Sequence, residues 1–263
     1  MTLTTISVVT TLDIIIPCLN EERQLPVALE ELSAFLKQHL KDYRWRIVVA
    51  DNGSSDRTND IAIERSVQDP EHFEAIHLKE RGRGRALKAA WMRSQADVVA
   101  YMDVDLSTDL AALPQLVEAV TTGGHHIAIG SRLARGAQVV GRPLKREITS
   151  RGYMMLLHAF FNVHFTDAQC GFKALKRSAA DKIVPLVQDT GWFFDTEMLL
   201  IAERNGYLVK DVPVQWRDDP DTRVQVVKTA IQDLRGIWRL RFGGIPRIAG
   251  TSLAPMTKPA SRR

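Results

Sequence analysis

Cysteine is scarce in this chain of 263 residues, which contains only Cys18 and Cys170. A chain of this size folds without crosslinks, so we predict no disulfide framework and expect a reducing compartment. Both cysteines are expected to be small buried residues. The seven histidines show no pairing at i, i+4 spacing and no cluster with the cysteines, so no zinc site is predicted.

Long hydrophobic runs are also missing. The longest uncharged stretch in the middle of the chain, residues 152–166, contains two histidines and an asparagine. It falls short of the roughly 18 to 20 apolar residues that span a bilayer. Residues 1–13 lack the basic start and apolar run of a signal peptide. We therefore expect a cytoplasmic protein that crosses no membrane but can bind peripherally to the cytoplasmic face of one.

Acidic residues are absent from residues 241–263, which hold five cations. The formal net charge of the whole chain is +4, so the rest of the chain carries −1. A nearly neutral body does not fit a nucleic-acid-binding protein, so no nucleic-acid partner is predicted. The basic end is suited instead to phosphates or an anionic lipid surface.

The remaining composition is that of an ordinary globular protein, with 45% hydrophobic and 25% charged residues. Short apolar runs alternate with helical patterns in the first half, which is typical of βαβ units and a mostly parallel sheet flanked by helices. The predicted strands are 13–17, 45–50, 73–78, 97–102 and 126–130, and the predicted helices are 21–40, 55–65, 84–95 and 111–121. Ligands of such α/β sheets bind beyond the carboxyl ends of the strands.

The alternation stops after residue 130. We expect a basic segment (142–151) that runs into an apolar one (153–165), a turn-like DAQCGFK segment, two helices near 177–187 and 195–205, a strand near 207–216, and an amphipathic basic stretch at 222–242. Residues 1–242 are predicted to form one domain with two halves, 12–130 and 131–242. Residues 243–263 are expected to be a basic flexible tail.

Asp103 and Asp105 follow one of the predicted buried strands. Two carboxylates on one turn suit Mg²⁺ or Mn²⁺ that also binds phosphate oxygens. A solvated turn or a helix cap more often explains such a pair, so this motif is weak by itself.

Two further loops carry polar groups at strand ends. Residues 51–58 (DNGSSDRT) offer Asp51, Asn52 and a glycine turn for a base or ribose, or only a helix cap. Residues 81–88 place Arg83 and Lys88 at a helix N-terminus, which favours a diphosphate, although a solvated basic loop is the alternative.

In this order and spacing, the motifs resemble the family 2 glycosyltransferases with a GT-A fold, within them the enzymes that transfer a sugar from a nucleotide to dolichyl or another polyprenyl phosphate. The resemblance covers about residues 12–240. The matching segments are PCLNEE (17–22), DNGSSDRT (51–58), GRGRALK (82–88), DVDLSTD (103–109), GSR (130–132), DAQCGFKALKR (167–177) and WFFDTEM (192–198). The DAQCGFK segment together with the later FDTE looks most like the dolichyl-phosphate β-glucosyltransferases, so UDP-glucose is the favoured donor. The DVDLSTD segment looks closer to prokaryotic relatives, some of which use mannose, so GDP-mannose is the next.

The resemblance also implies that residues 12–130 bind the nucleotide sugar and residues 131–242 the acceptor. Nucleotide contacts are implied for Pro17, Asn20, Glu21, Asp51 and Asn52; metal and diphosphate contacts for Asp103 and Asp105; phosphate contacts for Arg132 and Arg223; and a place near the sugar for Gln169. Asp167 or Asp195 would orient the sugar or act as a base, with Asp167 preferred; for Asp195 a helix start is the alternative. A phosphate acceptor is already largely ionised at neutral pH and needs little help from a base.

Two amphipathic stretches are predicted to bind the acceptor. Arg142, Lys145, Arg146 and Arg151 precede a run rich in Met, Leu and Phe, and residues 226–241 interleave large apolar residues with cations. Such helices suit a lipid interface, although a stripe of this kind also packs in cores. We therefore expect an inverting, metal-dependent hexosyltransferase acting on a lipid phosphate, with a soluble acceptor or a non-catalytic nucleotide-sugar-binding protein as the alternatives.

Overall fold

The computed structural model describes residues 9–217 and 226–251. Its strands are β1 (Thr11–Cys18), β2 (Arg44–Asp51), β3 (Phe73–His77), β4 (Val98–Met102), β5 (Ile127–Ser131), β6 (Gln138–Val140), β7 (Phe172–Lys176), β8 (Val209–Pro213) and β9 (Gln215–Arg217). Its helices are α1 (Leu25–His39), α2 (Thr58–Gln68), α3 (Arg83–Arg93), α4 (Leu113–Thr121), α5 (Leu144–Phe161), α6 (Arg177–Ile183), α7 (Phe194–Arg204) and α8 (Val226–Gly243), with short 3-10 turns η1 (Leu110–Ala112) and η2 (Val184–Leu186).

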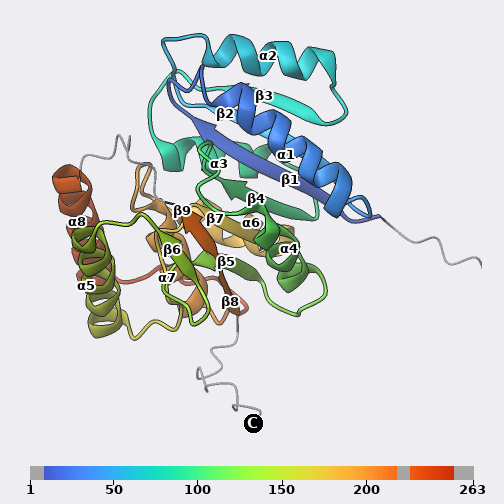
Figure 1. Cartoon of the computed structure of the whole chain (residues 1–263). Coiled ribbons are helices and arrows are strands. Elements are labelled where there is room, and N and C mark those ends of the chain that lie inside the picture. Colours follow the sequence, from blue (N-terminus) through green and yellow to red (C-terminus); the bar gives the residue numbers. More distant parts are fainter. Residues whose placement is uncertain (1–8, 218–225, 252–263) are drawn as a thin grey trace, which may run out of the picture.

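Among the described residues, seven strands form the main sheet in the order β3-β2-β1-β4-β7-β5-β8 (Figure 1). Six of these strands run parallel, and β7 runs antiparallel to both of its neighbours. The strands and helices predicted for the first half are confirmed, with small shifts at their ends. The turn-like segment 167–173 overlaps the antiparallel strand β7, which begins at Phe172 and was not predicted.

Helices cover both faces of the sheet. Apolar residues of α1 and α4 pack on one face of the sheet and form the first apolar cluster. Those of α3, α6 and α7 pack on the other face and form the second cluster, which α5 and α8 extend. The alternation of side chains along β1 feeds both layers, because Ile14 and Ile16 belong to the first cluster and Ile15 to the second. This arrangement places the carboxyl ends of β1, β2 and β4 at one edge of the sheet.

Helices α5 and α8 lie side by side at one end of the molecule (Figure 1). The predicted basic segment and the apolar run after it form one helix, α5, and the predicted strand near 207–216 is split into β8 and β9. Strand β9 pairs with β6 as a separate two-stranded sheet, which the sequence did not predict. No helix within 9–217 and 226–251 is long and apolar enough to cross a membrane.

The segment after α8 corrects one prediction. The predicted flexible tail begins at residue 243, but Ile245 and Ile248 pack against the core. The backbone N–H of Ile248 donates to Asn205 Oδ1 at 2.7 Å, and Asn205 Nδ2 donates to the carbonyl oxygen of Pro246 at 2.9 Å. These contacts fix residues 245–248 to the end of α7. The rest of the predicted tail, residues 252–263, lies outside the described residues.

Candidate active site

The loops that follow β1 and β2 are tied together by hydrogen bonds. Asn20 adopts a left-handed conformation (φ 57°), and its Oδ1 accepts from the backbone N–H of Ser55 at 2.8 Å. The N–H of Asn20 donates to Ser54 Oγ at 2.9 Å, and the N–H of Glu21 donates to Thr58 Oγ1 at 2.7 Å. Pro17, one residue before the end of β1, pairs in register with Ala50 of β2. The structure therefore brings the two predicted nucleotide-binding loops to one place.

Asp51 is buried beneath these loops. Its Oδ1 accepts from the N–H of Ser54 at 3.2 Å, and its Oδ2 lies 2.6 Å from Nδ1 of His77, at the end of β3. Asn52 Oδ1 accepts from the N–H of Gly82 at 2.6 Å, which joins this loop to the start of α3. The predicted pair Asp51 and Asn52 thus lies where three strand ends meet, a place suited to reading a base through hydrogen bonds.

Arg83 connects this edge to the acceptor half. Its Nη2 lies 2.7 Å from Asp103 Oδ1, and its Nη1 lies 2.6 Å from Asp195 Oδ2. The guanidinium also lies 5.0 Å from the ring centres of Tyr101 and Trp192. One buried arginine thereby holds two of the carboxylates predicted for the site.

Asp195 is surrounded by positive charge and donors. Its Oδ1 lies 3.0 Å from Nζ of Lys173 and accepts a hydrogen bond from the hydroxyl of Tyr101. Burial alone raises the pKa of a carboxyl group, but the charges of Lys173 and Arg83 outweigh burial and hold the pKa of Asp195 below its usual value. Asp195 is therefore an ionised, fixed group at neutral pH.

The residue pair predicted to bind metal lies on the turn after β4. The Asp103 side chain is partly exposed and Asp105 is exposed. Gly171 allows the Asp103 carboxylate to approach the backbone, because a Cβ there would lie 1.7 Å from Asp103 Oδ2. Mg²⁺ is commonly held by one or two carboxylates together with substrate phosphates, so these hard oxygen donors fit such an ion. Within the described part of the chain, no three His, Cys, Asp or Glu residues gather as a complete metal cage.

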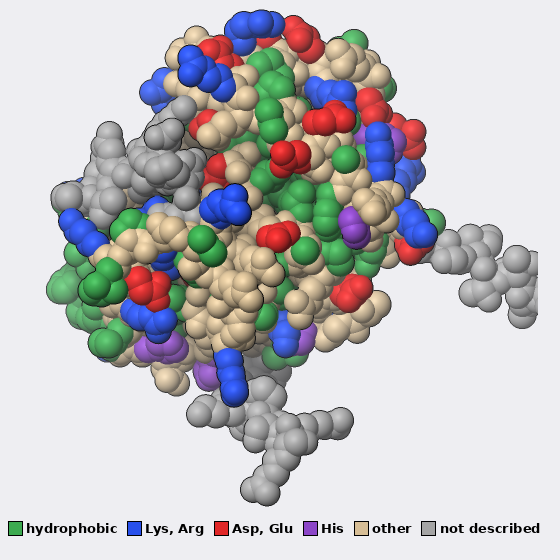
Figure 2. Space-filling model, in the orientation of Figure 1, with side chains coloured by type: hydrophobic (Ala, Val, Ile, Leu, Met, Phe, Trp, Pro, Cys, Tyr) green, Lys and Arg blue, Asp and Glu red, His purple; other side chains and the backbone are tan. Residues whose placement is uncertain are grey.

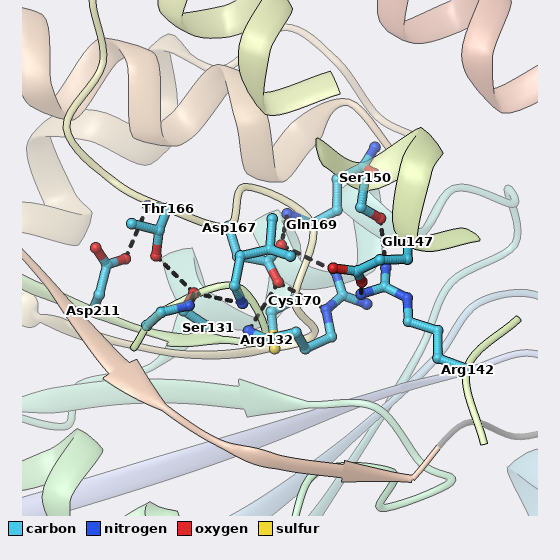
Figure 3. A network of polar contacts seen from close by, with 12 residues as sticks. Ser131, Arg132, Arg142, Glu147, Ser150, Thr166, Asp167, Gln169, Cys170 and Asp211 are labelled. Carbon is cyan, nitrogen blue, oxygen red and sulfur yellow. Dashed lines mark hydrogen bonds and ion pairs between the residues drawn. The ribbon is translucent and has the colours of Figure 1, made fainter. Parts of the chain in front are cut away.

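Arg132 and Asp167 form a second buried pair (Figure 3). Arg132 donates from Nε to Asp167 Oδ2 at 2.7 Å and from Nη2 to Asp167 Oδ1 at 3.0 Å, a bidentate arrangement. The guanidinium also lies 4.9 Å from the ring centre of Trp216. Burial favours the neutral acid, but the charge of Arg132 and its hydrogen bonds outweigh burial and lower the pKa of Asp167.

Arg142 lies next to Arg132 (Figure 3). Its guanidinium donates to Glu147 Oε2 at 3.1 Å and to the hydroxyl of Ser150, both on α5. Burial and repulsion by Arg132 lower the pKa of Arg142. Each guanidinium has one carboxylate partner, Asp167 for Arg132 and Glu147 for Arg142. The repulsion between the two guanidinium groups still favours a further anion beside them.

The remaining predicted residues have different outcomes. Gln169 lies beside the Arg132–Asp167 pair, its backbone N–H donating to Asp167 Oδ1 at 3.1 Å. Lys88 points elsewhere, because its Nζ donates to the carbonyl oxygens of Pro185 and Val187 at 3.2 and 2.7 Å. The structure thus gives Lys88 a role in joining α3 to η2 and does not bring it to the strand ends. Arg223 lies outside the described residues.

Sequence reasoning missed four polar residues of this region, and each had a signal. His77 ends β3, where the rule applied to the other strands points to a ligand. Tyr101 lies two residues before Asp103, and Lys173 interrupts the apolar residues of β7. Asp233 interrupts the amphipathic pattern of α8 and is buried. Cys18 and Cys170, as predicted, are free and buried.

Comparison with known proteins agrees with this geometry. The family model described as glycosyl transferase family 2 matches residues 13–184. The glycosyltransferase AglD of Haloferax volcanii is 36% identical over 232 residues, which are 86% of this chain and 37% of that protein. The chain thus spans little more than a third of AglD. The dolichyl-phosphate beta-glucosyltransferases of Drosophila melanogaster and Saccharomyces cerevisiae are 30% and 27% identical, covering 90% and 88% of this chain and 77% and 74% of theirs.

Among solved structures, the glucosyl-3-phosphoglycerate synthase of Mycobacterium tuberculosis superposes with a TM-score of 0.67 at 17% identity. The match covers 89% of this chain and 80% of that one. That enzyme was crystallised with Mn²⁺, UDP-glucose and phosphoglyceric acid. At this identity the likeness concerns the fold, and it confirms the predicted GT-A architecture.

Proposed function

Because this chain belongs to glycosyl transferase family 2 and is a glycosyltransferase, we propose that it transfers a hexose from a nucleotide sugar to a polyprenyl phosphate. The observation that carries the proposal is that two groups of charged side chains, one from each half of the chain, lie at the same edge of the sheet. Acids suited to a nucleotide and a metal lie on one side, and the buried Arg132–Arg142 pair lies on the other. The dolichyl-phosphate glucosyltransferases among the relatives support UDP-glucose as donor, with GDP-mannose next.

On the donor side, the loops of Asn20 and Asp51 would bind the nucleoside, and Asp103 with Asp105 would hold Mg²⁺ or Mn²⁺ together with the diphosphate. When bound, such an ion stabilises the negative charge that develops on the departing nucleoside diphosphate. Arg83 fixes the Asp103 carboxylate through a 2.7 Å contact. The Mn²⁺ and UDP-glucose bound by the structural neighbour support this assignment.

The reaction is an in-line displacement with inversion. An acceptor phosphate oxygen attacks the anomeric carbon, and the bond from that carbon to the β-phosphate oxygen breaks. Such a phosphate is largely ionised at pH 7, so it supplies its own nucleophile. Asp167 and Asp195 both have lowered pKa values and are held by cations, which makes them weak proton acceptors. We therefore assign them an orienting role: Asp167 aligns Arg132, and Asp195 aligns Arg83.

The acceptor phosphate would bind between Arg132 and Arg142. An anion there relieves the repulsion between the two guanidinium groups, and Ser150 adds a hydroxyl donor from α5. The bidentate Asp167 keeps Arg132 in place, and Glu147, 3.1 Å from Arg142, holds the second guanidinium. This site lies at the base of α5, so a lipid chain attached to the phosphate would run along that helix.

Helices α5 and α8 supply a surface for such a lipid. Large apolar residues on both helices are exposed: Leu144, Ile148, Met155 and Phe160 on α5, and Ile231, Leu234, Trp238 and Phe242 on α8. Figure 2 shows hydrophobic side chains gathered over this end of the molecule, with Lys and Arg beside them. Apolar residues bordered by cations suit the headgroup region of a membrane, so we propose peripheral binding to its cytoplasmic face.

A soluble acceptor is the second candidate. The observation in its favour is the structural neighbour, a synthase crystallised with phosphoglyceric acid, a small phosphorylated acid. The Arg132–Arg142 site would accept the phosphate of either kind of molecule, since both present the same dianion. The exposed apolar faces of α5 and α8 favour the lipid.

The experiment that tests this function measures nucleotide release from UDP-glucose, GDP-mannose and other nucleotide sugars. Each donor is supplied with Mn²⁺ or Mg²⁺, with and without a short polyprenyl phosphate in detergent, and separately with 3-phosphoglycerate. Release from one donor that requires the polyprenyl phosphate supports the proposal. Release stimulated only by the soluble acid supports the second candidate, and release from no donor contradicts both.

A further inference from the structure

Helix α8 exposes two large aromatic side chains and buries one carboxylate. Trp238, with 66% of its surface exposed, and Phe242 point outward, whereas the carboxylate of Asp233 points inward with 4% exposed. Asp233 shares the buried side of the helix with Ile237 and Leu240, at the spacing of one helical face. An apolar residue at position 233 would avoid the cost of burying a carboxylate, so the acid calls for a further explanation.

The two carboxylate oxygens of Asp233 differ in their partners. Its Oδ2 accepts a hydrogen bond from Gln169 Nε2 at 2.7 Å, and its Oδ1 is buried with no hydrogen-bond partner among the described residues. Asp189 and Tyr153 are the titratable groups that interact with it from the segment before α7 and from α5. Burial, with repulsion by Asp189, raises the pKa of Asp233 to about 7 despite the bond from Gln169. The ionised form of Asp233 is therefore destabilised by burial, and its hydrogen bond with Gln169 only partly offsets this free energy.

Helix α8 packs closely against the core, which fixes the position of the Asp233–Gln169 contact. Gly236, one turn after Asp233, lies against Phe193, whose ring atom Cδ1 would be 2.2 Å from a Cβ at that position. Phe193 is buried and directly precedes α7, the helix that carries Asp195. The position of Asp233 is therefore fixed relative to the carboxylates of the site.

Gln169 is the member of this pair that a substrate can reach, because it is partly exposed whereas Asp233 is not. It lies beside the Arg132–Asp167 pair (Figure 3). Gln169 Nε2 donates to Asp233 Oδ2, so the NH₂ end of the amide faces Asp233. The ionised form of Asp233, which predominates above about pH 7, only accepts hydrogen bonds and holds the amide in this orientation. The carbonyl oxygen is then the end presented outward. A carbonyl oxygen repels a phosphate and accepts from a hydroxyl.

We propose that Asp233 is a positioning residue that orients the amide of Gln169, so that its carbonyl oxygen accepts a hydrogen bond from a hydroxyl of the donor hexose. This inference rests on the proposed function, since the hexose is that of the nucleotide sugar. It adds a determinant of sugar recognition contributed by α8, a helix otherwise expected to serve only the acceptor side.

The test compares dissociation constants for UDP-glucose and UDP, and in parallel for GDP-mannose and GDP, by calorimetry in the presence of Mn²⁺. In the wild-type protein, the sugar is expected to tighten binding of one nucleotide. Asp233→Asn lets the amide of Gln169 adopt either orientation. We therefore expect the preference, which is the ratio of the dissociation constant of the nucleotide to that of the nucleotide sugar, to fall about 5- to 10-fold, the value of one hydrogen bond. Binding of the nucleotide alone should be unchanged. Glu203→Gln is the matched control: Glu203 is another buried carboxyl, bonded to backbone N–H groups of His164 and Phe165, and its loss should leave the preference intact.

The double variant Asp233→Asn with Gln169→Glu separates positioning from mere support of the fold. In this exchanged pair, the amide introduced on α8 donates to the carboxylate introduced in the loop, which again presents an oxygen outward, so the preference should return. Gln169→Glu alone places two carboxylates together, so this single variant should not show the preference for the nucleotide sugar. The inference is overturned if Asp233→Asn retains the preference, or if the double variant is no better than the single ones. A wild-type protein that binds neither sugar nucleotide more tightly than its nucleotide contradicts the proposed function itself.

Discussion

Asp103 and Asp195 bind the same guanidinium group, that of Arg83, at 2.7 and 2.6 Å. Asp103 lies on the turn after β4, and Asp195 lies in the first turn of α7. The shared arginine therefore sets the separation between the acid that would hold the donor's metal and the acid on the acceptor half. Both contacts are shielded from water, because the Arg83 side chain is 11% exposed.

Replacing Arg83 by methionine should destabilise the protein. The change leaves Asp195 beside Lys173 alone and Asp103 without its cation, and removing one partner of a buried pair typically costs about 3 to 5 kcal/mol. Urea unfolding measures the change. Arg93→Met is the control, since Arg93 forms an exposed ion pair with Glu74 and its loss should change the free energy of unfolding by less than about 1 kcal/mol. Equal effects of the two substitutions would contradict the central role of Arg83.

Asp105→Asn should remove activity without removing the fold. Asp105 is exposed on the turn after β4, so its amide analogue keeps the shape but loses the hard anionic oxygen that the proposed metal site needs. We expect kcat to fall about 100-fold or more, with an unchanged Tm. Asp109→Asn is the matched control at an exposed acid that caps η1, and it should retain the activity. A fully active Asp105→Asn enzyme would contradict the assignment of this residue to the metal.

The free energy of unfolding should depend on Asp233 in a defined direction. Its pKa is raised to about 7 in the folded protein, against an ordinary value near 4. The folded state then binds the proton more tightly, so the stabilisation is fully present below about pH 4 and is lost as the pH rises to about 7. Relative to wild type, Asp233→Asn should gain about 3 to 4 kcal/mol between pH 4 and pH 8, measured by urea unfolding. A constant difference between the two proteins would show that Asp233 does not titrate in this range.

Exposed aromatic residues of α8 should control binding to membranes. The double substitution Trp238→Ser with Phe242→Ser removes large apolar side chains from the proposed interface, and we expect binding to vesicles with anionic lipids to weaken by more than about 10-fold in a sedimentation assay. Val67→Ser is the control, because Val67 is 75% exposed on α2, away from α5 and α8 (Figure 1). Undiminished binding by the α8 variant would place the lipid contact elsewhere.

The first half of the chain was predictable because its strands are apolar runs separated by clear helical patterns. The acids at strand ends followed from topology alone: parallel strands deliver Asp51 and Asp103 to the same edge. The sequence also singles out the turn of Asp103 and Asp105, the loops beside it and, through resemblance, the Arg132–Asp167 segment, whose roles in binding stay predictions.

The rest depended on contacts between distant residues. Strand β7 was missed because Lys173 interrupts its apolar pattern, and only the pairing of this lysine with Asp195 and the Cys170 carbonyl oxygen allows it to be buried. Lys88 was assigned to the diphosphate because a helix N-terminus favours anions, but its side chain reaches toward η2. Asp233 looked like one polar residue of an amphipathic helix, since the sequence does not tell which side of α8 faces the core.

The most direct test of the account is to identify the product. The protein is incubated with Mn²⁺, a short polyprenyl phosphate and UDP-glucose or GDP-mannose, and the lipid fraction is analysed by mass spectrometry. The account predicts a polyprenyl phosphate that has gained one hexose, formed from one of the two donors and absent with Asp105→Asn. Nucleotide released without any hexose on the lipid, or the hexose found only on a soluble acceptor, would contradict it.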